Sequence, residues 1–171
     1  TDDDCLPDLY WISEIQNVIK NTGEETIALE GSILPVGNAS VDMADCPVNN
    51  IGGCFWSANI AVRRKIFEEV KGFDENFPIA AFEDTDLFLR LQEKGNIEFL
   101  KNAKVFHPVR RLKFWSYFLI TNKRLKSWIY LQKKHIKNKN LESESFIIGL
   151  YKLFLVTYKS SKEKKWKFCS M

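Results

Sequence analysis

The sequence contains no hydrophobic run long enough to cross a lipid bilayer as a helix. Its longest apolar stretch, residues 146–158, has 13 residues and is interrupted by Gly149 and Lys152, whereas a spanning helix needs roughly 17 residues or more. We therefore expect this stretch to form a core helix or an interfacial one. No internal repeat is visible either, which excludes a repeat protein.

Cysteine is sparse, and the spacing of the cysteines matches no metal-binding or redox motif. The four cysteines, Cys5, Cys46, Cys54 and Cys169, show no CxxC pair, and their density is not that of a disulfide-stapled scaffold. Free thiols in a reducing compartment are therefore expected. With no signal peptide visible, we expect a cytoplasmic protein, with peripheral attachment to the cytoplasmic face of the membrane as an option.

Basic residues are scarce in the first part of the chain and acidic residues in the second. Residues 1–103 hold 8 Lys and Arg against 19 Asp and Glu, and residues 104–171 hold 17 against 3. A basic segment predicts an anionic partner. Its lysines and arginines alternate with aromatic side chains, which favours an anionic membrane surface over nucleic acid; these aromatic residues are Trp115, Tyr117, Trp128, Tyr130 and Trp166.

Strand and helix signals alternate over the first two thirds of the 171 residues. Strands are expected at 26–33, near 52–59, at 97–100 and at 103–106, and helices from Pro7 to Asn21, over 61–70 and from Glu83 onward. This alternation predicts an α/β domain with a mainly parallel sheet and flanking helices over residues 1–108. Helical segments near 112–117 and 127–135 predict a basic, aromatic-rich helical extension over residues 109–171.

The stretch around Glu83 and Asp84 is the most informative part of the chain. Asp84, Leu87, Phe88 and Leu91 follow helical spacing, so one face of a helix would anchor in a core. Two adjacent carboxylates at the start of such a helix, after an apolar loop, suit a general base at the edge of a pocket. The simpler interpretation is that they cap the helix and oppose its dipole.

Three carboxylates, Asp2, Asp3 and Asp4, open the chain. Asp2 and Asp4 alternate along an extended segment, where their oxygens suit one Mg²⁺ or Mn²⁺ ion; a solvated acidic segment is the alternative. The pair Gly52-Gly53 permits a close backbone approach to a ligand such as a diphosphate, or simply a tight turn.

His107 ends the last predicted strand of the α/β domain. A single histidine is most often a packed or surface residue. At a strand end, where loops converge on the carboxyl edge of a parallel sheet, it becomes a candidate metal ligand. The sequence therefore predicts that Asp4, Asp84 and His107 meet in one cleft.

In this order, the motifs resemble those of family 2 glycosyltransferases of the GT-A fold. The resemblance covers about the first 107 residues and rests on the segments Thr1-Asp2-Asp3-Asp4-Cys5-Leu6-Pro7, Gly52-Gly53 to Arg63-Arg64, Gly72-Phe73-Asp74-Glu75, Glu83-Asp84-Thr85-Asp86-Leu87 with Arg90-Leu91, and Ala103 to His107. Because the family places a nucleotide-binding βαβ half before its DxD motif, the resemblance implies the C-terminal portion of a transferase.

The resemblance also implies roles for individual residues. Asp4 and His107 would hold a divalent cation, Mg²⁺ or Mn²⁺, and Asp2, Asp3, Asp4, Gly52 and Gly53 would contact the nucleotide-sugar donor. Asp84, with Glu83 as second candidate, would be the catalytic base. The implied activity is an inverting, metal-dependent transfer of sugar to a saccharide or lipid-linked acceptor in polysaccharide, cell-wall or glycolipid synthesis.

Two other functions remain open at this stage. A nucleotidyltransferase would share the GT-A-like fold but transfer a nucleotide, and the Glu83-Asp84 pattern argues against it. A non-catalytic module would dock its basic half on membrane or nucleic acid and use the acidic cluster only structurally; salt-dependent RNA binding would favour that function.

Overall fold

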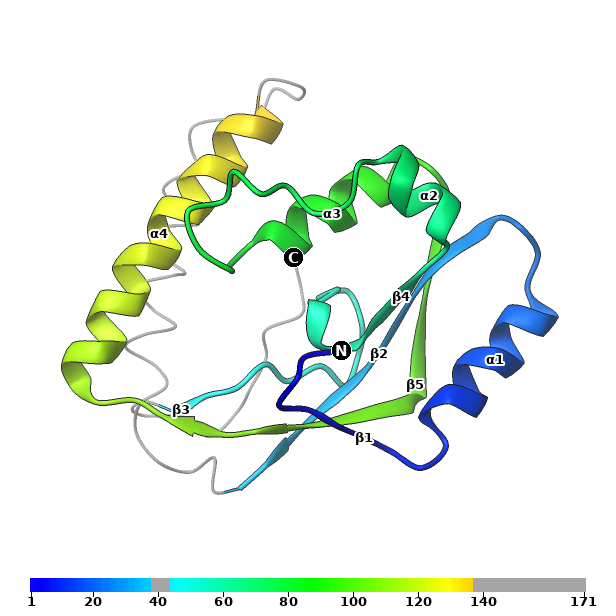
Figure 1. The fold of residues 1–171 in the computed structure, drawn as a ribbon, viewed down its shortest axis with the longest axis horizontal. Coiled ribbons are helices and arrows are strands. Elements are labelled where there is room, and N and C mark those ends of the chain that lie inside the picture. Colours follow the sequence, from blue (N-terminus) through cyan, green and yellow to red (C-terminus); the bar gives the residue numbers. More distant parts are fainter. Residues whose placement is uncertain (38–43, 137–171) are drawn as a thin grey trace.

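A four-stranded mixed sheet forms the centre of the protein (Figure 1). The computed structural model describes residues 1–37 and 44–136. The strands lie in the order β1-β5-β2-β4; their bounds are Leu6–Pro7 for β1, Asn96–Pro108 for β5, Thr26–Val36 for β2 and Ile60–Val62 for β4. The predicted α/β class is confirmed. The predicted sheet was mainly parallel, and the observed one is mixed: its long central pair β2–β5 is parallel and both outer pairs are antiparallel.

The side chain of one asparagine joins strands β2 and β5 at the point where their register shifts. The register of β2 with β5 slips between Gly31 and Ser32, where Gly31 pairs with Leu100 and Ser32 with Lys104. Asn59 bridges the slip, since its Nδ2 donates to the carbonyl oxygens of Ser32 and Ala103, each at 2.8 Å. The strands expected at 97–100 and 103–106 are therefore a single bulged strand.

The α-helices within residues 1–37 and 44–136 are α1 Trp11–Asn21, α2 Arg64–Glu69, α3 Glu83–Gln92 and α4 Phe114–Ile136. α1 ends where the sequence predicts but begins at Trp11 and not at Pro7, because Pro7 pairs with Val105 in the sheet as part of β1. α2 begins later than expected because β4 takes up the start of the predicted helix. The strand expected to follow the loop near 52–59 begins only at Ile60, as β4. The segment 52–59 is a loop followed by the short 3₁₀ helix η1, Ser57–Asn59, because the buried carboxylate of Glu30 accepts its backbone N–H groups.

The helical spacing of α3 buries its apolar face in the main core, as predicted. Leu87 and Leu91 are fully buried beside Phe55 and Ile27, and the rings of Phe88 and Phe55 lie 5.4 Å apart. On the opposite side of the helix, the buried Asp86 pairs with Arg90 one turn later at 2.7 Å. The start of α3 is therefore held by packing and by an ion pair.

The extension after Pro108 begins with β6, Arg110–Arg111, paired with β3, Ala44–Asp45, and continues as α4. The two segments expected near 112–117 and 127–135 form this one helix. Lys134 Nζ lies 2.5 Å from Asp74 Oδ2 and 2.9 Å from Asp86 Oδ1, which fixes the end of α4 against α3. The helix expected at residues 146–158 lies outside the described residues. Within 1–37 and 44–136, no helix has the length and apolar character to cross a membrane.

Candidate functional site

Four side chains that bind metals in other proteins gather where β1 meets the end of β5. β1 pairs antiparallel with β5, with Leu6 opposite Phe106, so the residues just before Leu6 come close to His107, which follows Phe106. Asp2, Asp4, Cys5 and His107 each offer a ligand atom, and these atoms all lie within 4.8 Å of one another. We call these four residues the cation group. Asp3, predicted together with Asp2 and Asp4, is exposed and lies outside the group.

The imidazole of His107 is oriented for ligation. The residue is only 4% exposed, and its Nδ1 lies 2.9 Å from the carbonyl oxygen of Pro108. Because a carbonyl oxygen only accepts, Nδ1 carries the proton in the neutral ring and Nε2 presents its lone pair. Nε2 lies 3.8 Å from Asp2 Oδ2 and 3.7 Å from Asp4 Oδ1, so it points into the cation group.

Asp4 uses its two oxygens differently. Oδ2 accepts from the guanidinium of Arg110 at 2.5 Å, and this hydrogen bond holds the pKa of Asp4 below its usual value. Oδ1 is buried and has no hydrogen-bond partner in the described part of the chain. A buried carboxylate oxygen without a donor is costly, and a cation held beside Nε2 of His107 would satisfy it. The residues of the group therefore fit a divalent ion.

The acidic pair Glu83-Asp84 begins α3, directly after Phe82, whose φ of 69° is left-handed. Asp84 accepts hydrogen bonds from the backbone N–H groups of Thr85, at 2.7 Å, and of Ser57. Burial and the neighbouring charge of Glu83 nevertheless raise the pKa of Asp84 to about 6. A carboxylate with such a pKa is suited to accept a proton near neutral pH.

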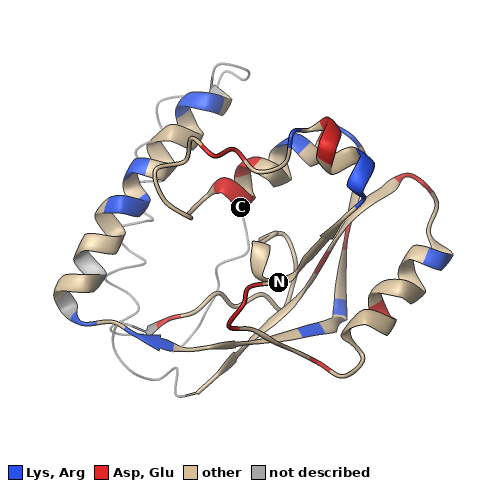
Figure 2. Ribbon diagram, in the orientation of Figure 1, with Lys and Arg blue, Asp and Glu red and all other residues tan. Residues whose placement is uncertain are grey.

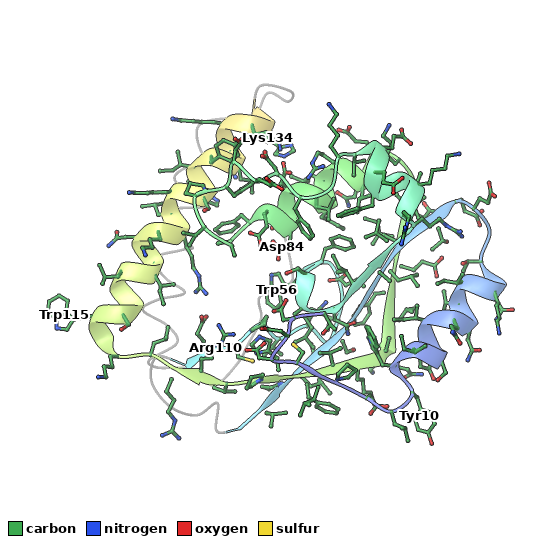
Figure 3. The ribbon with its side chains drawn as sticks, in the orientation of Figure 1. Tyr10, Trp56, Asp84, Arg110, Trp115 and Lys134 are labelled. Atoms are coloured by element: carbon green, nitrogen blue, oxygen red, sulfur yellow. The ribbon has the colours of Figure 1, made fainter. Side chains whose placement is uncertain are left out.

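The acidic pair is coupled electrostatically to Asp2 of the cation group. Burial, together with the charge of Asp2, raises the pKa of Glu83, and Glu83 in turn raises the pKa of Asp84. In Figure 3 the side chain of Asp84 extends from α3 toward the loop that carries Trp56, on the side of the chain's N-terminal segment. Of the three residues expected to share a cleft, Asp4 and His107 are thus within contact distance, and Asp84 is linked to them electrostatically through Glu83 and Asp2.

The glycine pair predicted to contact a donor is already engaged. The N–H of Gly52 donates to Asn49 Oδ1 at 2.9 Å, and the N–H of Gly53 donates to Glu30 Oε2 at 2.8 Å. These donors are therefore not directed at a bound diphosphate. The two glycines line an open pocket of about 400 Å³ with Phe88 and Gln92. Neither the cation group nor the acidic pair lines that pocket.

Sequence reasoning missed Glu30, Cys5 and Arg110. Glu30 is the only charged residue in the strand predicted at 26–33, and an isolated charge in a buried strand indicates internal partners. Cys5 directly follows the acidic triplet, so a mixed ligand set was visible in the sequence. No sequence signal marks Arg110, because its pairing with Asp4 depends on the contact between β1 and the end of β5.

Comparison with known proteins gives no match to this chain among family models, curated proteins or solved structures.

Proposed function

We propose that this chain belongs to an inverting, metal-dependent glycosyltransferase that moves a sugar from a nucleotide-sugar donor to an acceptor hydroxyl in polysaccharide or glycolipid synthesis. The observation that carries the proposal is the meeting of Asp2, Asp4 and His107, and the charge of Asp2 also acts on Glu83 of the acidic pair. Carboxylates at the start of the described chain and a histidine at the end of β5 meet only through the pairing of β1 with β5. The resemblance to GT-A transferases implies Asp4 and His107 as metal ligands and Asp2 as a donor contact.

Asp2, Asp4 and His107 would hold the cation, through Asp2 Oδ2, Asp4 Oδ1 and His107 Nε2. Carboxylate oxygens with one imidazole suit Mg²⁺ or Mn²⁺. When bound, such an ion neutralises the charge of the departing nucleoside diphosphate. The guanidinium of Arg110, whose side chain is 61% exposed beside Asp4, adds positive charge at the same place for an anionic donor.

Asp84 would be the general base. It removes the proton from the acceptor hydroxyl while that oxygen forms a bond to the anomeric carbon of the donor sugar. The bond from the anomeric carbon to the diphosphate oxygen breaks, and the nucleoside diphosphate leaves with the electron pair. Since this scheme uses one base and no carboxylate nucleophile, the configuration at the anomeric carbon inverts.

A donor screen tests the proposal. We expect the intact protein to release nucleoside diphosphate from one member of a panel of UDP-, GDP- and dTDP-sugars when Mn²⁺ is present. The release should stop when EDTA is added. Asp4→Ala should weaken metal-dependent donor binding at least about tenfold, because it removes a ligand oxygen, whereas the exposed Glu24→Ala should not. Calorimetric titration of each variant with donor, in the presence and absence of Mn²⁺, measures the two donor affinities.

Three results would contradict this assignment. Donor affinity that is the same with Mn²⁺ and with EDTA would exclude the cation group from donor binding. Release of inorganic diphosphate from a nucleoside triphosphate would indicate a nucleotidyltransferase instead. RNA binding that weakens steeply with salt, without any turnover of donor, would indicate a binding module.

The outer surface of α4 supports the expected contact with an anionic membrane. Trp115 and Leu119 are 72% and 59% exposed, and in Figure 3 Trp115 points away from the body of the protein. Exposed basic residues lie nearby in sequence, including Arg111, Lys113 and Lys123, and Figure 2 shows basic bands along this helix. Aromatic side chains flanked by lysine and arginine are typical of interfacial segments.

Vesicle co-sedimentation tests this contact. We expect binding to phosphatidylserine-containing vesicles at low salt and none to neutral vesicles, because each lysine or arginine near an anionic surface contributes about 1 kcal/mol. Trp115→Ala should weaken binding several-fold. Tyr10→Ala, which removes an aromatic ring that is 64% exposed at the other end of the molecule (Figure 3), should not. An equal loss of vesicle binding in the two variants, or vesicle binding that does not depend on anionic lipid, would contradict the proposed membrane contact of α4.

A further inference from the structure

We propose that the thiolate of Cys5 is a ligand of the cation group, and that the site therefore takes a borderline divalent ion such as Zn²⁺ or Co²⁺ in preference to Mg²⁺. The inference rests on the proposed cation site, but not on the transfer of sugar. It changes the expected ion, because the resemblance to GT-A transferases implies Mg²⁺ or Mn²⁺ held by oxygen and nitrogen ligands alone.

The backbone brings Cys5 into the group. The N–H of Cys5 donates to the carbonyl oxygen of Asp2 at 3.3 Å, which closes a turn over residues 2–5. Asp3 is exposed on this turn, whereas the ligand atoms of Asp2, Asp4 and Cys5 gather with that of His107. The sulfur therefore lies within 4.8 Å of each of the other three ligand atoms, and Cys5 is only 9% exposed.

Two buried groups point to a ligand independently of the sulfur. His107 is more than nine-tenths buried, and its Nε2 faces the carboxylates of Asp2 and Asp4 at 3.8 and 3.7 Å. Those distances exceed a hydrogen bond and leave room for an ion between the groups. Asp4 Oδ1, on the same side, is buried and lacks a donor in the described part of the chain.

The chemistry of the four ligands selects the ion. Mg²⁺ takes oxygen ligands in a near-octahedral shell and avoids sulfur. Zn²⁺ accepts carboxylate, imidazole and thiolate together in one four-coordinate site, and Co²⁺ is likewise a divalent first-row ion with affinity for such mixed N/O/S ligands. Binding displaces the thiol proton of Cys5 to solvent, and the sulfur lone pair then forms the bond to the metal.

Cys46 provides a matched control. It is also a free, buried cysteine beside His107, but its Sγ lies 3.7 Å from Nδ1, the ring nitrogen that faces away from the cation group, and 3.6 Å from the carbonyl oxygen of His107. It does not belong to the group. Serine at position 5 or 46 therefore removes one of two similar thiols, and only one of them is placed to bind the ion.

The test is a titration of the intact protein with Co²⁺, followed by absorbance. We expect a near-ultraviolet thiolate-to-cobalt charge-transfer band in the wild type and in Cys46→Ser, and its loss in Cys5→Ser. Cys5→Ser should also weaken Zn²⁺ binding at least about tenfold, while Mn²⁺ binding, which depends on the oxygen and nitrogen ligands, stays within about twofold. A band that persists in Cys5→Ser, or disappears in Cys46→Ser alone, would overturn the proposal.

A second measurement covers the case in which Cys5→Ser does not fold. Bound Zn²⁺ should protect Cys5 of the wild type from iodoacetamide, and mass spectrometry would locate the modification. Unchanged alkylation of Cys5 at saturating Zn²⁺ would overturn the thiolate ligand. If Mn²⁺ supports donor turnover but Cys5 does not bind the ion, the proposed function stands and this inference fails. If a cobalt–thiolate band is seen but no donor is turned over, this inference stands and the proposed transferase function fails.

Discussion

Asp84→Asn should reduce sugar transfer by about a hundred- to ten-thousandfold, the range that a general base contributes. The amide is nearly isosteric with the carboxylate, and its oxygen can still accept from the backbone N–H group of Thr85. Only the ability to take a proton is lost. Donor affinity, which depends on the cation group, should therefore remain within about twofold, and rate and binding measured on the same preparation separate the two roles.

The pH profile gives this assignment a sharper test. Because the pKa of Asp84 is raised to about 6, the base is protonated in acid, and kcat/KM should fall as the pH drops below about 6. The charge of Glu83 contributes to that raised pKa, so Glu83→Gln should move the acid limb to lower pH. Glu93→Gln, an exposed change at the other end of α3, should leave the profile in place.

Two outcomes would reject Asp84 as the base. If Asp84→Asn weakens donor binding as strongly as Asp4→Ala does, the carboxylate belongs to the donor site. If Asp84→Asn transfers sugar at the wild-type rate and with the same fall in kcat/KM at low pH, another group accepts the proton of the acceptor hydroxyl. Glu83→Gln then shows whether the neighbouring carboxylate is that group.

The largest loss of stability is expected for Glu30→Ala. The Glu30 carboxylate, 3% exposed, accepts from the backbone N–H groups of Gly53, Cys54 and Phe55 and from the side-chain amide of Asn49. Alanine leaves all four donors without this acceptor, and each buried unsatisfied donor costs about 1–3 kcal/mol. Since the N–H of Gly53 is near solvent, we expect the free energy of unfolding to fall by about 3–5 kcal/mol, a large share of a typical total.

Urea denaturation followed by circular dichroism measures this loss. Glu30→Gln should cost about half as much, because its amide oxygen still accepts and only the NH₂ group opposes a backbone donor. Glu24→Ala changes an exposed glutamate nearby in the sequence and should alter the free energy of unfolding by less than about 0.5 kcal/mol. A Glu30→Ala protein within 1 kcal/mol of wild type, by the same measure, would show that water replaces the carboxylate.

The features that the sequence determined by itself are local. The end of α1 at Asn21, the buried face of α3 with its Asp86–Arg90 pair, and the strand beginning at Thr26 follow from spacing, turn residues and apolar runs over a few neighbouring positions. The acidic pair and His107 could be placed at element ends for the same reason.

Tertiary structure decided everything that depends on distant partners. The 52–59 segment became a loop because Glu30, far earlier in the chain, takes its N–H groups, and two expected strands merged because Asn59 bridges β2 and β5. Cys5 joins Asp2, Asp4 and His107 only through the register of β1 on β5. Spacing along the chain carries no information on such pairings, since their energies arise between groups that meet only after the sheet has formed.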